Sequence, residues 1–317
     1  MIVFATSDKG GTGRSVTSCN MAYRLAMGRN LKVAYLDFDF GSPTAGALFE
    51  VSSVEEGTAS GAGLHSYLEG RTPVPERVIV RTSTDREALR AQRSRGGLTL
   101  FPGDKGGGET VTATPPVVER CVDLLKELDT QFPVVIVDLS SGRSAAMKIA
   151  LEATCPANMV QNKVYWLVFH RWTRQHVMAA HSLVWGVDGI VQSGEAARTS
   201  GRAWYAEGQL ESRIRYVRTA VPSLEDAATA IGGPQAAWVQ KQDDALRSFA
   251  ARKRLGEGKV LGETPVEPVL QWREQIILDT DVNAHIANRP TVDAFEELAR
   301  ALVDENTWVP VNNRSGA

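Results

Sequence analysis

An apolar stretch, a glycine-rich segment and a helical pattern follow one another at the start of this chain. Residues 2–5 read I-V-F-A, residues 9–16 read K-G-G-T-G-R-S-V, and residues 17–26 carry apolar side chains at roughly helical spacing. This order predicts a buried strand, a loop and a helix N-terminus. Glycines let backbone N–H groups crowd around an anion, and the helix dipole adds positive potential there. The segment therefore predicts a phosphate-binding loop.

The segment departs from the general phosphate-loop pattern G-x-x-x-x-G-K-[ST]. Asp8 stands at the first glycine position, Arg14 at the lysine position, and Lys9 stands in front of the glycines. Arginine is a larger, planar cation with forked donors, so Arg14 is expected to hold phosphate oxygens with a geometry different from that of lysine. The negative charge of Asp8 is unfavourable beside phosphates unless it pairs with Lys9 or Arg14.

Two further predicted strands end on aspartates. Residues 32–36 lead into Asp37 and Asp39, and residues 133–138 form a β-branched run that closes on Asp138. A buried strand that ends on Asp downstream of a phosphate loop has the Walker B layout, in which the carboxylate reaches a Mg²⁺ shell at the carboxyl edge of the sheet. Together with the loop, these carboxylates favour nucleotide binding over a glycine turn without a ligand.

Strand and helix patterns alternate along the rest of the chain, which predicts an α/β fold: a three-layer sandwich with a mostly parallel twisted sheet and helices on both faces. We expect a single domain over residues 1–310, a polar helical insertion around 222–260, a polar tail over 311–317 and a loop over 50–62. Further strands are expected at 78–82, 98–102, 164–169 and 214–220, and further helices at 63–70, 117–128, 145–153, 175–185 and 291–303.

Composition narrows the function classes. The chain has 317 residues and a formal net charge of −2, so no global basic field points to nucleic acid as the main partner. The basic residues Arg247 and 252–254 are either a solvated helix face or a contact for DNA or an acidic partner. No stretch approaches the length of a membrane span, and the chain opens on a core strand; both features predict a cytoplasmic protein. The three cysteines are far apart in the sequence and are expected to be buried thiols.

Residues 9–15 resemble the deviant Walker A motif, K-G-G-x-G-K-[ST], of the ParA/MinD group of P-loop ATPases. The likeness extends along most of the chain. The aspartates after residue 36 stand where that group has its D-x-D switch segment, and residues 135–138 stand where it has Walker B. The strand at 164–169 and the helix at 294–299 follow in the same order.

The resemblance implies ATP and Mg²⁺ as ligands and a role for each motif residue. Lys9 would reach across a nucleotide-sandwich dimer to the phosphates of the other subunit, and Asp39 would position the attacking water. The residues expected to act in catalysis are Lys9, Arg14 and Asp39. Those expected to bind the nucleotide are Gly10, Gly11, Thr12, Gly13, Arg14, Ser15 and Val16, and those expected at the metal are Ser15, Asp37 and Asp138.

The leading hypothesis is an ATP-dependent homodimerising switch with weak or partner-stimulated ATP hydrolysis, which positions or regulates an unidentified protein partner. The alternative is a degenerate ATPase that serves as a non-enzymatic, nucleotide-bound scaffold. A metal–sulfur carrier of the same fold would need a cysteine pair that this sequence lacks, and no small-substrate pocket of a biosynthetic relative is evident. His170 and Trp172 are expected to be a structural pair at a strand end, and Arg218 and Thr219 stand where the group often has an adenine-reading asparagine.

Overall fold

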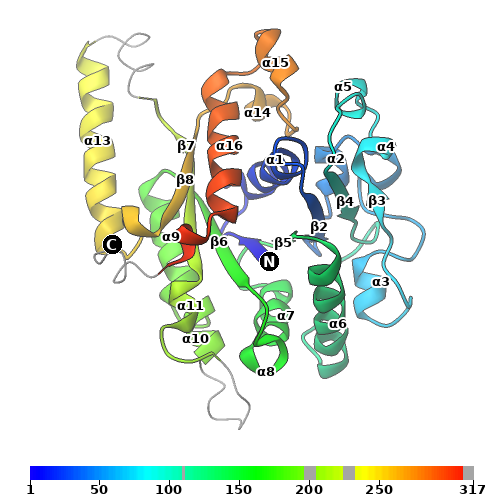
Figure 1. Ribbon diagram of the computed structural model, residues 1–317. Helices are drawn as coiled ribbons and strands as arrows, with labels where there is room; N and C mark the ends of the chain where they lie inside the picture. The colour runs from blue at the N-terminus through cyan, green and yellow to red at the C-terminus, as the bar shows by residue number, and fades with distance from the viewer. Residues whose placement is uncertain (109–110, 196–204, 224–232, 310–317) are drawn as a thin grey trace.

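An eight-stranded sheet forms the centre of the protein in the computed structural model, which describes residues 1–108, 111–195, 205–223 and 233–309 (Figure 1). The strand order is β3-β4-β2-β5-β1-β6-β7-β8. Every neighbouring pair is parallel except β3 and β4. The strands are β1 (Ile2–Thr6), β2 (Lys32–Phe38), β3 (Val78–Ile79), β4 (Gly97–Phe101), β5 (Val134–Leu139), β6 (Val164–Arg171), β7 (Ile214–Val221) and β8 (Val260–Pro265). The predicted mostly parallel sheet is confirmed.

Both faces of the sheet are buried, because successive residues of a strand point to opposite sides. In β1, Ile2 and Phe4 belong to one apolar core cluster, while Val3 and Ala5 belong to another. The first cluster lies against α3 (Leu64–Leu68), α6 (Pro115–Gln131), α7 (Ala145–Ala153), α9 (Arg174–Trp185) and α10 (Ile190–Glu195). The second lies against α1 (Arg14–Met27), α2 (Ala45–Leu48) and α16 (Arg289–Val303). The three-layer sandwich is therefore confirmed.

Short helices connect and extend these layers. They are α4 (Val80–Ser83), α5 (Glu87–Arg90), α8 (Pro156–Met159), α11 (Gln209–Ser212), α14 (Val269–Trp272) and α15 (Asp279–Asn283), with the 3-10 turns Ser52–Val54, Glu257–Lys259 and Glu305–Trp308. The longer α13 (Gly233–Arg252) stands at the side of the molecule next to α9 (Figure 1).

Several predicted elements differ from the observed ones. The strand expected at 78–82 stops at Ile79 and turns into α4. The loop expected at 50–62 contains a 3-10 turn at Ser52–Val54. The expected insertion at 222–260 contains α13, while residues 224–232 lie outside the described residues. Strand β8 had no predicted counterpart, because its residues V-L-G-E-T-P mix apolar and polar side chains, as an edge strand does.

The residues just before the predicted C-terminal tail pack on the body of the protein. Trp308 is buried, its ring stacks on Tyr165 of β6 at 3.8 Å, and its Nε1–H donates to the Leu302 carbonyl. Residues 310–317, which include the predicted tail at 311–317, lie outside the described residues.

Candidate functional site

The glycine-rich loop connects β1 to α1 at the carboxyl edge of the sheet, where ligands of open parallel sheets bind. Gly11 and Gly13 have φ values of +68° and +72°, which L-residues with side chains seldom adopt, and the Gly13 carbonyl accepts the N–H of Thr17 to begin the helix. A cavity of about 160 Å³ lies over this loop. Its walls include Gly10, Thr12, Ser15 and Val16 as well as Asp39 and Glu274. The predicted cradle is therefore formed.

Arg14 does not extend over the loop but turns toward the ends of the neighbouring strands. Its Nε donates to Asp138 Oδ1 at 2.5 Å, and its Nη2 donates to Asp39 Oδ2 at 2.9 Å and to Ser15 Oγ at 3.2 Å. The Arg14 side chain is 7% exposed. Burial alone would lower the pKa of Arg14, but the charges of Asp138 and Asp39 outweigh it and raise the pKa. The guanidinium is thus a permanent cation that bridges two carboxylates.

The carboxylates around Arg14 occupy different environments. Asp138 is buried at the end of β5, and burial raises its pKa against the opposing effect of Arg14. Asp37 lies next to Asp138 in the strand register and accepts the backbone N–H of Ala45 at 2.9 Å. Burial raises the pKa of Asp37 to about 8, and the charges of Asp138 and Asp39 act in the same direction. Asp37 therefore holds the loop after β2.

Lys9 and Asp8 lie in front of the loop. Lys9 is exposed and makes no salt bridge within the part of the chain that the structure describes. Asp8 pairs with neither Lys9 nor Arg14: it accepts from Arg143 Nη1 at 3.1 Å. The side chain of Arg143 also donates to the Ser182 carbonyl of α9. The acidic side chain beside the loop is thus neutralised by a residue that sequence analysis did not select, and Lys9 keeps its charge available.

Three other residues lie near the loop, of which sequence analysis had named Thr219. Thr219 of β7 donates from Oγ1 to the Thr12 carbonyl at 2.6 Å and so ties the loop to the sheet. Ser140, directly after β5, accepts the Phe40 N–H and donates to the Phe38 carbonyl. Glu274 lines the loop cavity from the segment after α14. Serine, threonine and glutamate are common on loops, so only proximity in the fold distinguishes these three.

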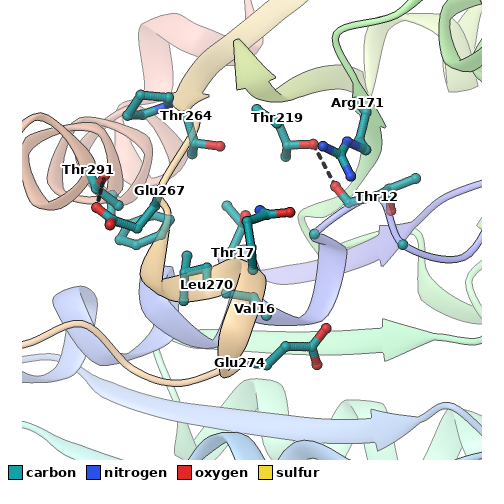
Figure 2. Close-up of a pocket in the computed structure, with 16 residues that line it drawn as sticks. Thr12, Val16, Thr17, Arg171, Thr219, Thr264, Glu267, Leu270, Glu274 and Thr291 are labelled. Atoms are coloured by element: carbon teal, nitrogen blue, oxygen red, sulfur yellow. Dashed lines mark hydrogen bonds between the residues drawn. The ribbon is translucent and has the colours of Figure 1, made fainter. Parts of the chain in front are cut away.

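A second cavity of about 270 Å³ adjoins the loop (Figure 2) and shares Gly11, Thr12, Gly13 and Val16 with the first. Thr12, Val16 and Thr17 form one wall, and Thr219 and Thr264 lie across from them. Glu267 is buried at the far side, where it accepts from Thr291 Oγ1 at 2.7 Å and from the Asn288 N–H at 2.9 Å. The cavity is large enough for a flat organic ring and opens beside the phosphate loop.

The residues beyond the loop that sequence analysis selected have structural contacts. His170 is buried, and burial lowers its pKa to about 4. Trp172 donates from Nε1 to Asp243 Oδ1 at 2.6 Å. Arg218 stacks on the Trp172 ring at 4.2 Å and points away from the second cavity's wall into an ion pair with Glu263. His170 and Trp172 thus pack inside the fold, as predicted for a structural pair.

The basic residues of α13 and its end also contact their own chain. Arg247 bridges Asp243 and Glu263, and Arg254 lies over the Trp185 ring at 4.6 Å. The cysteines Cys19, Cys121 and Cys155 are buried thiols, as predicted. Within the described ranges, no helix has the length and apolar character needed to cross a membrane.

The residues predicted to bind Mg²⁺ can be compared with the oxygen ligands that this ion prefers. Hydroxyl and carboxylate oxygens such as those of the predicted residues Ser15, Asp37 and Asp138 are the ligands that Mg²⁺ takes, at about 2.0–2.1 Å in a near-octahedral shell. Here Ser15 and Asp138 accept hydrogen bonds from the Arg14 guanidinium, as the neighbouring Asp39 does, whereas Asp37 accepts the Ala45 N–H. A cation already lies among the donors, so the arrangement as it stands does not fit a Mg²⁺ ion.

A phosphate loop between a first parallel strand and its helix, with strand-end aspartates beside it, defines a P-loop nucleotide-binding protein. The chain matches the family described as the CobQ/CobB/MinD/ParA nucleotide-binding domain over residues 3–309, and it belongs to that family. No curated protein sequence matches it closely enough to count as a relative.

Solved structures show the same fold. The MinD cell division protein of Aquifex aeolicus is similar with a TM-score of 0.55 and 15% identity, over 95% of each chain. The MinC:MinD cell division protein complex of Aquifex aeolicus matches with a TM-score of 0.53, 14% identity and 95% of each chain. A candidate plasmid partition protein of Borrelia burgdorferi, bound to AMPPNP, matches with a TM-score of 0.56, 13% identity, 95% of this chain and 97% of that chain. At these sequence identities, the structural similarity establishes the fold alone.

Proposed function

We propose that this chain binds ATP at the loop of residues 9–16 and forms an ATP-dependent homodimer that positions or regulates a protein partner. The observation that carries the proposal is the position of Lys9. It is exposed in front of a formed phosphate cradle, and the neighbouring Asp8 is already paired with Arg143. A free ammonium there is available to the phosphates of a second subunit. In this proposal, residues 1–310 form a single domain.

The two adjoining cavities support the proposed position of the nucleotide. The phosphates would lie over Gly10, Gly11 and Gly13 in the smaller cavity, and the base would lie in the larger one beside Thr219. The hydroxyls of Thr219 and Thr264 would offer hydrogen bonds to the base edge. ATP is favoured over GTP because a family neighbour of the same fold carries the ATP analogue AMPPNP.

Hydrolysis in this proposal is weak or depends on stimulation by the partner. Asp39 is the residue placed to orient the attacking water, but Arg14 Nη2 holds its carboxylate at 2.9 Å. Phosphoryl transfer depends on positioning and on charge stabilisation, so a restrained Asp39 slows turnover. Mg²⁺ at Ser15, Asp37 and Asp138 stays a prediction from the resemblance and has no part in the steps proposed here.

The proposal is tested by the association state of the purified chain. Analytical ultracentrifugation with ATP is expected to give a species of twice the monomer mass of 34.4 kDa, and ADP is expected to leave the monomer. Nucleotide content and phosphate release are measured on the same sample. A protein that binds no ATP, or whose mass is the same with ATP and ADP, contradicts the proposal.

The alternative function is a degenerate ATPase that serves as a nucleotide-bound scaffold. The contact between Arg14 and Asp39 favours it, because the residue expected to activate water is engaged by a permanent cation. Lysine in place of arginine would free this carboxylate and restore the usual phosphate contact.

We therefore expect Arg14→Lys to raise ATP turnover by about tenfold or more, as a recovered transition-state contact of a few kcal/mol would allow. A phosphate-release assay compares the variant with the wild type under the same conditions. Asp39→Asn in the Arg14→Lys background is the control and should remove the gain. If the wild type already turns over as fast as Arg14→Lys, the scaffold function is ruled out.

A further inference from the structure

The cluster formed by Arg14, Ser15, Asp39 and Asp138 places a positive charge where the family chemistry calls for one. Ser15 opens α1, Asp39 follows β2 and Asp138 ends β5. Three separate elements therefore direct oxygen atoms to one point at the sheet edge. In a P-loop protein, a hydroxyl and carboxylates so placed hold a divalent cation that bridges to the phosphates.

Arg14 satisfies these oxygens from within the chain. Its Nε is 2.5 Å from Asp138 Oδ1, and its Nη2 reaches both Asp39 Oδ2 and Ser15 Oγ. Charge-assisted bonds of this kind are the strong ones, and a planar guanidinium keeps several of them in fixed directions. The Asp138 side chain is 3% exposed, so moving Arg14 away would leave a buried carboxylate unpaired. The arginine is therefore held firmly in this position.

The guanidinium also retains a donor for an anion. Nε and Nη2 are engaged, whereas Nη1 makes no hydrogen bond to any other residue that the structure describes. Arg14 lines the loop cavity together with Gly11, Gly13 and Ser15. One side chain can thus hold the carboxylates and keep the two N–H groups of Nη1 unpaired beside the cavity over the loop. A bound divalent cation makes the same link between carboxylate and phosphate.

We propose that the Arg14 guanidinium takes the place of the divalent cation, so that this chain binds its nucleotide without a metal ion. The inference rests on the proposed function, since it assumes that ATP binds at the loop. It also gives a reason for arginine at the position where the Walker A motif has lysine. A compact ammonium group has too short a reach to contact Asp138, Asp39 and Ser15 at the same time.

The test measures the affinity of the full chain for a fluorescent ATP analogue, once with excess EDTA and once with millimolar Mg²⁺. Wild type is expected to bind in EDTA with an affinity no more than about threefold weaker than in Mg²⁺, which is well below the tenfold that corresponds to 1.4 kcal/mol. A larger loss in EDTA overturns the inference and leaves ATP binding intact. Absence of binding in both buffers overturns the proposed function as well.

Arg14→Lys provides the contrasting variant, because lysine leaves Asp138 free for a metal. Its binding is expected to weaken by about tenfold or more in EDTA relative to Mg²⁺. Arg143→Lys is the matched control: Arg143 also pairs with an aspartate of the loop, Asp8, but lies outside the cluster, so this variant should remain independent of the metal. If Arg14→Lys is as independent of Mg²⁺ as the wild type, Arg14 does not replace the cation.

A measurement on wild type alone guards against a variant that fails to fold. Electron paramagnetic resonance of Mn²⁺ added without nucleotide reports free and protein-bound metal directly. No bound Mn²⁺ is expected, because Arg14 already occupies the position between Ser15, Asp39 and Asp138. Stoichiometric Mn²⁺ binding that Asp138→Asn removes would overturn the inference.

Discussion

Replacing Arg218 by alanine is expected to lower the free energy of unfolding by about 2–5 kcal/mol, the range found when a large buried side chain is cut back to alanine. Arg218 is fully buried, and its Nη1 donates to Glu257 Oε1 at 2.7 Å and to Glu263 Oε1 at 2.6 Å. Its guanidinium lies 4.2 Å from the centre of the Trp172 ring. The substitution leaves Glu263 without its inner partner and a cavity beneath Trp172. Chemical denaturation of both proteins measures the difference.

Arg247→Ala is the matched control for Arg218→Ala. Arg247 contacts the same two glutamates and the same tryptophan ring, but its side chain is 37% exposed. Its ion pairs with the two glutamates are in contact with solvent and contribute about 0–1 kcal/mol. Arg247 also pairs with the buried Asp243, but that carboxylate keeps the Trp172 Nε1 donor, so a smaller loss than for Arg218→Ala is expected. Equal losses for the two variants would show that burial does not make Arg218 the anchor between β7 and β8.

Replacing Lys9 by alanine is expected to abolish ATP-dependent dimerisation and to leave ATP bound to the monomer. Lys9 lies outside the ring of backbone N–H groups that the glycines and the α1 N-terminus provide, so its loss spares most of the cradle. Across a dimer interface it would be the charge that meets the phosphates of the other subunit. Sedimentation with ATP should therefore report a monomer at concentrations where wild type is a dimer.

Lys105→Ala is the control for Lys9→Ala, because Lys105 is also an exposed lysine but pairs with Glu56 and does not line the loop cavity. It should dimerise as wild type does. Persistence of the ATP-dependent dimer in Lys9→Ala would contradict the assigned role of Lys9. Loss of ATP binding in Lys9→Ala would instead place Lys9 on the nucleotide of its own subunit.

The strongly patterned elements could be predicted because their physical signals are local. The apolar run of β5 and the amphipathic stripe of α6 depend only on residues close in sequence, and both appear in the structure near their expected positions. The helix expected at 145–153 has the observed bounds, since Ser144 caps its first turn through the Met147 N–H. By contrast, β8 is a strand only because β7 offers it an edge, and no local pattern conveys that.

The candidate site, like the fold, could be predicted from the sequence only in part. The residues of the loop, the aspartates and their common edge followed from the sequence by itself, because parallel strands deliver their carboxyl ends to one side of a sheet. The direction in which the Arg14 side chain points could not be predicted from the sequence. It depends on the contacts of residues 14, 39 and 138, which are brought within hydrogen-bond distance only when β1, β2 and β5 pair.

The same holds for the pairing of Asp8 with Arg143 and of Thr219 with the Thr12 carbonyl. The sequence determined that a phosphate cradle with an exposed lysine would form, since backbone geometry and helix polarity are encoded within a few residues. Only the tertiary structure decided which charged side chains pair around it. Long, flexible side chains can pair with several residues, and the fold determines which of these lie within reach.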